Sequence, residues 1–180
     1  MMKKLILILG DQLDINSSVL RDFDTSTDEV LMIESQNEST YVWSHKAKIA
    51  IFLSAMRHFA QTLRSKKFPL TYIKESPLPI VEVLKEQILQ KKIKHLVCIE
   101  PGEWRLKQAI EELAKELGVE LEMRPDEHFY CSRQEFVEWA ANKKELRLEY
   151  FYRLMRKTHN ILLDKDGNPE GGQWNFDQDN

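Results

Sequence analysis

Three short polar segments follow aliphatic runs of this sequence, and their residue types suit the binding of a small polar ligand. Gly10, Asp11 and Gln12 follow LILIL, Glu34 ends EVLMIE, and EPGEWR at residues 100–105 follows HLVCI. Carboxylates accept hydrogen bonds from ring N–H groups and hydroxyls, and a side-chain amide both donates and accepts. Glycine lets a ligand come close to the backbone. These residues predict ligand binding where the three runs end.

Aromatic and acidic residues near these segments add to the candidates, and each also has a purely structural interpretation. Tyr41 or Trp104 could stack on an aromatic ring, and Glu38 and Glu103 could accept hydrogen bonds. An aspartate after a strand often only shapes a turn, as Asp11 would. Glu103 could merely complement a helix dipole, a benefit of about 0.3–1 kcal/mol. Trp104 is more often a packing residue, so the residue types alone leave both interpretations open.

The aliphatic runs also predict the elements that would position these residues. Runs that are apolar at nearly every position are typical of strands covered on both faces, and we expect such strands at residues 5–9, 29–34 and 95–100. Residues 70–74 and 119–123 carry polar positions, so they are expected to be edge strands. The alternation of strands and helices favours a parallel sheet with right-handed crossovers. We therefore expect an α/β, Rossmann-like fold with five parallel strands in the order 3-2-1-4-5 and helices on both faces.

Helices are expected between these strands. Ser44 is the expected N-cap of a helix reaching Ser65, and residues 35–43 are expected to form a loop before it. One apolar stripe runs along that helix, made by Ile49, Phe52, Met56, Phe59 and Leu63. Further helices are expected from Pro79 and over residues 103–117, with Gly118 as the C-cap.

The predicted strand order brings the polar segments together. The sheet changes direction between its first and fourth strands, and ligands of open α/β sheets bind at such a switch point. The second strand lies on the other side of the first, so the segments at Gly10, Glu34 and Glu103 are expected to frame one crevice. No catalytic or metal-binding residue is predicted there.

Composition and missing motifs exclude several classes of protein. The 180 residues carry a net charge of −3, and Cys98 and Cys131 lie too far apart for a cysteine cluster. No apolar segment is long enough to span a membrane, and MMKK before LILIL is too short for a signal peptide, so we expect a cytoplasmic protein without a membrane partner. The GxGxxG, GxxxxGK[ST] and GxSxG motifs are absent.

The sequence changes character after the fifth predicted strand. Residues 133–141 and 145–157 are expected to form two helices, the first capped by Ser132. From residue 160 onward, the sequence has no hydrophobic periodicity, which predicts a linker. The predicted organisation is an α/β domain at residues 1–130, appended helices at 131–159 and the start of an interdomain linker at 160–180.

Several of these stretches resemble one known family. They are LILILGDQL at 5–13, ESTYVWSHKAKIAIFLSAMRHF at 38–59, EPGEWR at 100–105, EYFYRLMRK at 149–157 and GGQWNFDQDN at 171–180. Together they resemble the N-terminal antenna domain of the deoxyribodipyrimidine photolyase-related proteins, which are iron–sulfur bacterial cryptochromes and (6-4) photolyases. GDQ alone is a weak signal, whereas the second, third and fifth stretches together are specific.

The resemblance implies a function in light-driven DNA repair or blue-light signalling. Family members bind FAD and a [4Fe-4S] cluster in a C-terminal helical domain, and some bind the antenna chromophore 6,7-dimethyl-8-ribityllumazine in the N-terminal domain. Carried over by motif, the antenna cleft would be lined by the residues Gly10, Asp11, Gln12, Ile33, Glu34, Glu38 and Tyr41, with EPGEWR, including Glu103, closing its other side. Glu38 and Tyr41 are the residues expected to bind and stack on the chromophore.

The resemblance also implies what this chain lacks. No segment of the 180 residues corresponds to the FAD pocket, the cluster cysteines or the lesion pocket, so we expect an N-terminal fragment that does not repair damaged DNA by itself. The faces of residues 150–157 and 174–177 are expected to dock the helical FAD domain, and their exposed aromatics favour self-association of the isolated chain. Two alternatives remain: a Rossmann-like scaffold with an empty cleft, and a nucleotide-binding module of the universal-stress type.

Overall fold

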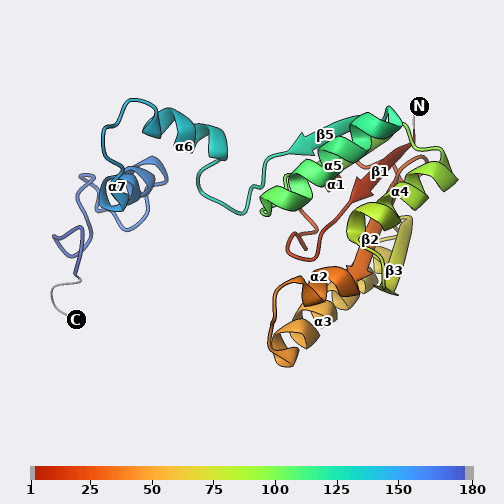
Figure 1. The fold of residues 1–180 in the computed structure, drawn as a ribbon. Coiled ribbons are helices and arrows are strands. Elements are labelled where there is room, and N and C mark those ends of the chain that lie inside the picture. The colour runs from red at the N-terminus through yellow and green to blue at the C-terminus, as the bar shows by residue number, and fades with distance from the viewer. Residues whose placement is uncertain (1–2, 177–180) are drawn as a thin grey trace. The chain divides into compact units, whose positions relative to one another are not determined.

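A computed structural model of the chain describes residues 3–176. The chain divides into two compact units, Met1–Pro125 and Asp126–Asn180. The first contains a five-stranded, entirely parallel sheet in the order β3-β2-β1-β4-β5 (Figure 1). The strands are β1 (Lys4–Leu7), β2 (Glu29–Ser35), β3 (Leu70–Ser76), β4 (His95–Ile99) and β5 (Glu120–Arg124). The predicted α/β fold and strand order are confirmed.

The central position of β1 follows from its apolar sequence. Leu5 pairs with Glu29 of β2 on one side and with Leu96 of β4 on the other. Successive side chains point to opposite faces of a strand, so a strand covered twice must be apolar at every position. Leu5, Ile6 and Leu7 are accordingly at most 1% exposed.

Helices cover both faces of the sheet (Figure 1). One face packs against α4 (Ile80–Lys91) and α5 (Trp104–Leu117), and the other packs against α1 (Ser18–Arg21) and α3 (Lys46–Ser65). The two core layers alternate along each strand: Leu5 and Leu7 belong to the first, whereas Ile6 and Ile8 belong to the second. At the C-terminus of α5, Gly118 adopts the left-handed conformation predicted for a helix C-cap, with φ at +62°.

The segment predicted to be a loop at residues 35–43 is instead partly helical. It contains α2 (Gln36–Tyr41), whose N-cap is Ser35. The Ser35 hydroxyl accepts a hydrogen bond from the backbone N–H of Glu38 at 3.3 Å. A serine followed three residues later by a glutamate is a typical helix-start pattern, and this is the signal that the loop prediction overlooked.

Two details of α3 also differ from the prediction. Its N-cap is His45 rather than Ser44, because the His45 ring Nδ1 accepts from the backbone N–H of Ala47 at 3.2 Å. The predicted apolar stripe is buried only in its C-terminal part, at Met56, Phe59 and Leu63. Phe52, one turn earlier than Met56, is 44% exposed. The N-terminal half of α3 extends beyond the sheet (Figure 1), so Phe52 is not buried in the core.

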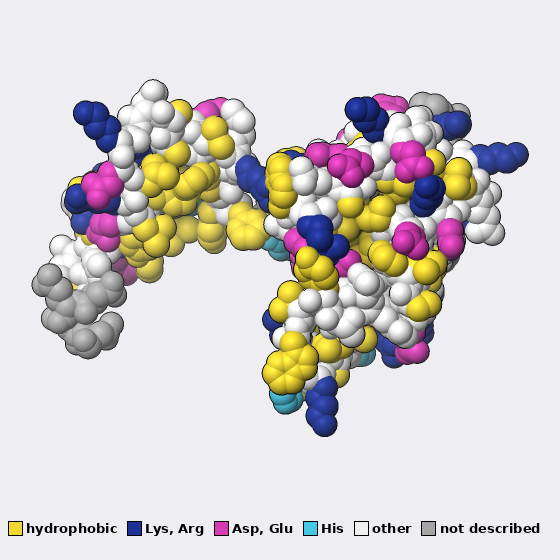
Figure 2. All heavy atoms as spheres, in the orientation of Figure 1, with side chains coloured by type: hydrophobic (Ala, Val, Ile, Leu, Met, Phe, Trp, Pro, Cys, Tyr) yellow, Lys and Arg dark blue, Asp and Glu magenta, His cyan; other side chains and the backbone are white. Residues whose placement is uncertain are grey.

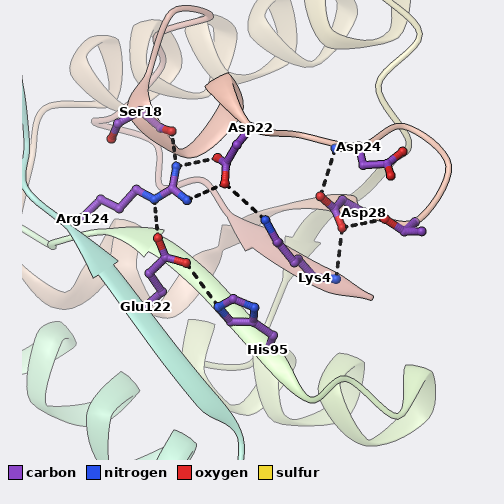
Figure 3. Close-up of polar contacts among 9 residues, drawn as sticks. Lys4, Ser18, Asp22, Asp24, Asp28, His95, Glu122 and Arg124 are labelled. Carbon is purple, nitrogen blue, oxygen red and sulfur yellow. Dashed lines mark hydrogen bonds and ion pairs between the residues drawn. The ribbon is translucent and has the colours of Figure 1, made fainter. Parts of the chain in front are cut away.

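A polar network secures the edge strand β5 on the sheet face that packs against α1 (Figure 3). Arg124 donates to both carboxylate oxygens of Asp22, at 2.7 and 2.9 Å, and to Glu122 at 2.6 Å. The hydrogen bonds from Arg124 hold the pKa of Asp22 well below its usual range. Lys4 also donates to Asp22 at 3.2 Å, and His95 Nε2 lies 3.3 Å from Glu122. This network joins β1, β4 and β5 to the loop after α1.

The second unit contains α6 (Arg133–Ala140) and α7 (Leu148–Thr158). Ser132 and Glu135 form a reciprocal capping box at the start of α6, as the predicted cap requires. Hydrophobic side chains lie on the surface of α6 and α7 (Figure 2). The exposed ones on α7 include Leu148, Tyr150 and Tyr152. The domain boundaries at residues 130 and 159 stay predictions, and residues 177–180 of the predicted linker lie outside the described residues.

Candidate functional site

A cleft lies at the carboxyl ends of β1, β2 and β4, where the sequence predicted a ligand site. Its cavity volume is about 300 Å³. The residues lining it from the strand ends and the following loops are Leu9, Gly10, Asp11, Ile33, Glu34, Ser35, Glu38, Ser39, Pro101, Gly102 and Glu103. The remaining lining residues come from the segment before α3, from α3 itself and from α4 and α5: Ser44, Lys48, Ile49, Phe52, Leu53, Met56, Ile80 and Leu106. Three loops that are distant in sequence thus meet at one cavity.

Gly10 allows the close approach of α3 to the end of β1. A Cβ atom at Gly10 would lie 2.5 Å from two carbons of the Phe52 ring and 2.8 Å from the Met56 sulfur. Real Cβ atoms do not approach so closely, so any larger residue would displace the Phe52 ring, which itself lines the cleft. At Gly102, on the opposite wall, the nearest atom to an added Cβ is an Asp11 carboxylate oxygen at 4.0 Å. Only the first glycine is sterically required.

Glu34 forms a buried, fully paired charge at the edge of the cleft. Its side chain is 2% exposed, and Arg57 of α3 donates from Nε to Oε1 and from Nη2 to Oε2, both at 2.8 Å. The Tyr72 hydroxyl of β3 donates to Oε1 as well. The hydrogen bond from Arg57 lowers the pKa of Glu34, against the opposing effect of burial. Both oxygens of Glu34 are thus occupied by the protein, so its main role is to hold α3 on the sheet.

Arg105 connects the two walls of the cleft at Glu38 and Glu103. Its Nη2 donates to Glu38 Oε2 at 2.6 Å, and its Nε donates to Glu103 Oε1 at 2.7 Å. The guanidinium carbon lies 4.3 Å from the centre of the Tyr41 ring. These hydrogen bonds raise the pKa of Arg105 above its usual value, so it stays charged. Both carboxylates that face the cleft here are therefore paired with one cation.

Two of the predicted site residues do not line the cleft. Gln12 is 4% exposed, and its Nε2 donates to the backbone oxygens of Glu100, at 3.2 Å, and Ile99, at 3.5 Å. It therefore fixes the loop after β1 to the end of β4. Tyr41 is 61% exposed and its ring is covered by Arg105. The structure places the other six, Gly10, Asp11, Ile33, Glu34, Glu38 and Glu103, along the cavity.

The sequence analysis did not identify the contribution of α3 to the cleft. Lys48 and Phe52 are four residues apart on one face of α3, and both line the cavity together with Ser44, which precedes the helix. Ile49 and Met56, assigned to a core-facing stripe, also line it. The signal was present in this spacing, but the sequence did not indicate that the helix extends past the end of the sheet.

The cleft is electrostatically acidic. Asp11, Glu34, Glu38 and Glu103 contribute four carboxylates to its lining, whereas Lys48 contributes one ammonium group. Arg57 and Arg105 neutralise part of this charge, but each is already shared between two carboxylates. Such a lining favours ligands that donate hydrogen bonds and disfavours anions. Over residues 3–176, no group of three or more histidine, cysteine, aspartate or glutamate side chains is arranged to hold a metal ion.

No helix within the described part of the chain is long and apolar enough to cross a membrane. The buried Cys98 and the partly exposed Cys131 are both free thiols. Burial raises the pKa of the Cys98 thiol to about 12, so it stays protonated at neutral pH and is unsuited to nucleophilic chemistry.

Comparison with known proteins identifies the family. A family model described as deoxyribodipyrimidine photo-lyase-related protein matches residues 6–180. The chain is also similar to a (6-4) photolyase of Agrobacterium fabrum (strain C58 / ATCC 33970), with 37% identity over 183 aligned positions that cover 99% of this chain. The alignment covers 36% of that photolyase, so the chain spans about a third of the length of this relative. Because the family model matches nearly the whole sequence, the chain belongs to the deoxyribodipyrimidine photolyase-related family.

Proposed function

We propose that the unit Met1–Pro125 is the antenna domain of a photolyase- or cryptochrome-related flavoprotein and binds a ribityllumazine chromophore in the cleft. The observation that carries this proposal is the cavity at the ends of β1, β2 and β4, with its polar acceptors and apolar wall. When bound, the chromophore 6,7-dimethyl-8-ribityllumazine would absorb light and transfer excitation to a flavin. The chain contributes binding and orientation, not bond chemistry.

The size of the cavity supports a ligand of this class. Small-molecule pockets range from about 300 to 1,000 Å³, so a cavity of about 300 Å³ suits a bicyclic ring with one short chain better than a dinucleotide. The apolar wall formed by Ile49, Phe52 and Met56 offers a packing surface for a ring. One flank of the cleft is therefore suited to the ring, and the acidic residues are suited to its polar substituents.

The lining chemistry supports hydroxyl-rich ligands. Asp11, Glu38 and Glu103 offer carboxylate oxygens, which accept hydrogen bonds from ribityl hydroxyls. Asp11 is solvent-exposed, so it suits the part of the ligand nearest to the mouth. Glu34 is already saturated by Arg57 and Tyr72, and in this proposal it does not contact the chromophore.

The proposed activity of the whole protein requires more than these 180 residues. In this proposal, FAD and a [4Fe-4S] cluster are bound by a separate helical domain, which would carry out light-driven repair of damaged DNA, as a lyase, or signalling. The exposed aromatic residues of α7, Tyr150 and Tyr152, are the proposed docking surface for that domain. The isolated chain is accordingly expected to be inactive in DNA repair.

Titration of the purified chain with 6,7-dimethyl-8-ribityllumazine, followed by ligand fluorescence, tests the proposal. Saturable one-to-one binding is expected, and Glu38→Ala should weaken it, whereas Glu116→Ala, on the exposed surface of α5, should leave it unchanged. Absence of saturable binding would contradict the antenna function. Tight binding of ATP instead would favour the nucleotide-binding alternative. Binding of neither ATP nor the ribityllumazine would favour the scaffold alternative.

A further inference from the structure

Arg105 occupies an unusual position at the mouth of the cleft. It belongs to the first turn of α5, directly after the wall formed by Pro101, Gly102 and Glu103. Its side chain reaches the opposite wall, where it pairs with Glu38 of α2 at 2.6 Å. Neither Arg105 nor Tyr41, which it covers, lines the cavity. Arg105 therefore acts on the cleft through the residues that it holds.

The element that Arg105 holds has little other support. The helix α2 has six residues and none of them is buried. The Ser39 hydroxyl bonds to the Ser35 backbone oxygen, at the start of the same helix, and Gln36 bonds to the backbone of Glu75 on the β3 side. Short helices without buried side chains open at low free-energy cost. The contact with Arg105 joins this weakly held helix to the β4–α5 wall.

The geometry suits an arginine specifically. The guanidinium donates to two carboxylates, and at the same time its carbon lies 4.3 Å from the centre of the Tyr41 ring. A planar fork with several donors can do both, whereas a lysine ammonium is a point charge on a flexible stem. The Glu38 side chain is 22% exposed and that of Arg105 is 38% exposed, so water only partly screens the pair.

We propose that Arg105 is a positioning residue that latches α2 across the mouth of the cleft, orients the Glu38 carboxylate and slows the escape of the bound ligand. With Glu38 Oε2 held by Arg105, the carboxylate has a fixed orientation in the cavity lining. A fixed acceptor loses less freedom when the ligand binds. The effect on the ligand rests on the proposed function above, whereas the closure of α2 does not.

The chain offers a matched control on the same helix. Lys107, two residues after Arg105, also pairs with a carboxylate, Glu100, at 2.6 Å, and it lies 5.5 Å from the Trp104 ring centre. Its carboxylate partner follows β4 and is not part of α2. Lys107→Gln therefore removes a comparable ion pair near the same wall without releasing α2.

The first experiment needs no ligand. Amide hydrogen exchange over residues 36–41 should become about three- to tenfold faster in Arg105→Gln, as expected for the loss of a partly exposed, charge-assisted contact. Arg105→Lys should recover part of this protection, and Lys107→Gln should match the wild type. The urea midpoint of the sheet should be the same in all four proteins. Unchanged exchange in Arg105→Gln overturns the latch, whatever the ligand does.

The second experiment measures dissociation of 6,7-dimethyl-8-ribityllumazine by stopped-flow fluorescence. The dissociation rate should be about tenfold higher in Arg105→Gln, as expected for the loss of a charge-assisted contact. Lys107→Gln should dissociate at the wild-type rate. Faster exchange of α2 with an unchanged dissociation rate overturns the role of Arg105 in ligand retention. If the wild type does not bind this ligand, the proposed function fails, and hydrogen exchange alone decides whether Arg105 closes α2.

Discussion

The Arg57 guanidinium clamps the Glu34 carboxylate with two parallel hydrogen bonds of 2.8 Å, which join α3 to the end of β2. The carboxylate is 2% exposed and the arginine side chain is 41% exposed. The pair is therefore buried on one side and reached by water on the other. Because Glu34 follows directly from the core of β2, this pair sets the position of the helix that carries Lys48 and Phe52 into the cleft.

Arg57→Ala should destabilise the protein by leaving the Glu34 carboxylate without its main partner. We expect a loss of about 2 kcal/mol in the free energy of unfolding, below the 3–5 kcal/mol typical of a fully buried pair, because water reaches the arginine side. Arg57→Lys keeps the charge but cannot form both hydrogen bonds, so its free energy of unfolding should fall by less. Urea unfolding at pH 7 measures both, and equal stability of Arg57→Ala and the wild type would contradict a stabilising role for the pair.

The stability of the sheet should depend on the ionisation of Glu29. Burial of this side chain is outweighed by hydrogen bonds from Lys91, Thr71 and Lys3, and its pKa falls from 4.5 to about 2. Since the folded-state pKa is the lower one, this stabilisation is complete above pH 4.5 and is lost as the pH falls to about 2. Glu29→Gln should therefore destabilise the protein by up to about 3 kcal/mol at pH 7.

Urea unfolding of the wild type and Glu29→Gln at several pH values checks this dependence. The difference between them should shrink steadily below pH 4.5. Glu120→Gln is the matched control, since Glu120 is the first residue of β5, as Glu29 is of β2, and it is solvent-exposed. A difference for Glu29→Gln that stays constant down to pH 2 would contradict the depressed pKa.

Gly10→Ala should weaken ligand binding more than it weakens the fold. The new methyl group would displace the Phe52 ring, which is 44% exposed and can move at modest cost, so we expect a loss of about 1 kcal/mol in stability. The displaced ring would alter the apolar wall of the cleft, and ribityllumazine affinity should fall at least about tenfold. Gly102→Ala, where the nearest atom to the added Cβ is 4.0 Å away, should keep the stability of the wild type. Equal stabilities of Gly10→Ala and Gly102→Ala would contradict the steric requirement at Gly10.

The acidic cleft should discriminate against phosphorylated ligands. Four carboxylates and one ammonium group line it, so a ribityl phosphate would meet net repulsion that a free ribityl alcohol does not. We expect the phosphorylated form of the ribityllumazine to bind at least about tenfold more weakly at low salt, with a smaller difference at 0.5 M salt. Competition titrations measure this ratio. Equal or tighter binding of the phosphate would show that Lys48 or another cation dominates the site.

The pattern of apolar residues was sufficient to predict the sheet. Residues 5–9, 30–33 and 96–99 are apolar at every position, and such runs are typical of interior strands covered on both faces. The polar positions in Leu70–Ser76 and Glu120–Arg124 required edge positions, and the order β3-β2-β1-β4-β5 follows. The place of the cleft followed in turn, because the carboxyl ends of parallel strands lie at one edge.

Which side chains reach the cleft could not be predicted from the pattern and depends on long-range packing. Gln12 is polar and adjacent to Asp11, yet it turns inward to bond the end of β4, while Asp11 faces the cavity. Tyr41 does not line the cavity, and its ring instead contacts Arg105, which lies 64 positions later in the sequence. Periodicity describes one element at a time, so it cannot show how far α3 extends past the sheet or which distant cation will pair with Glu38. Those outcomes depend on the relative placement of elements, which is set by packing of the whole core.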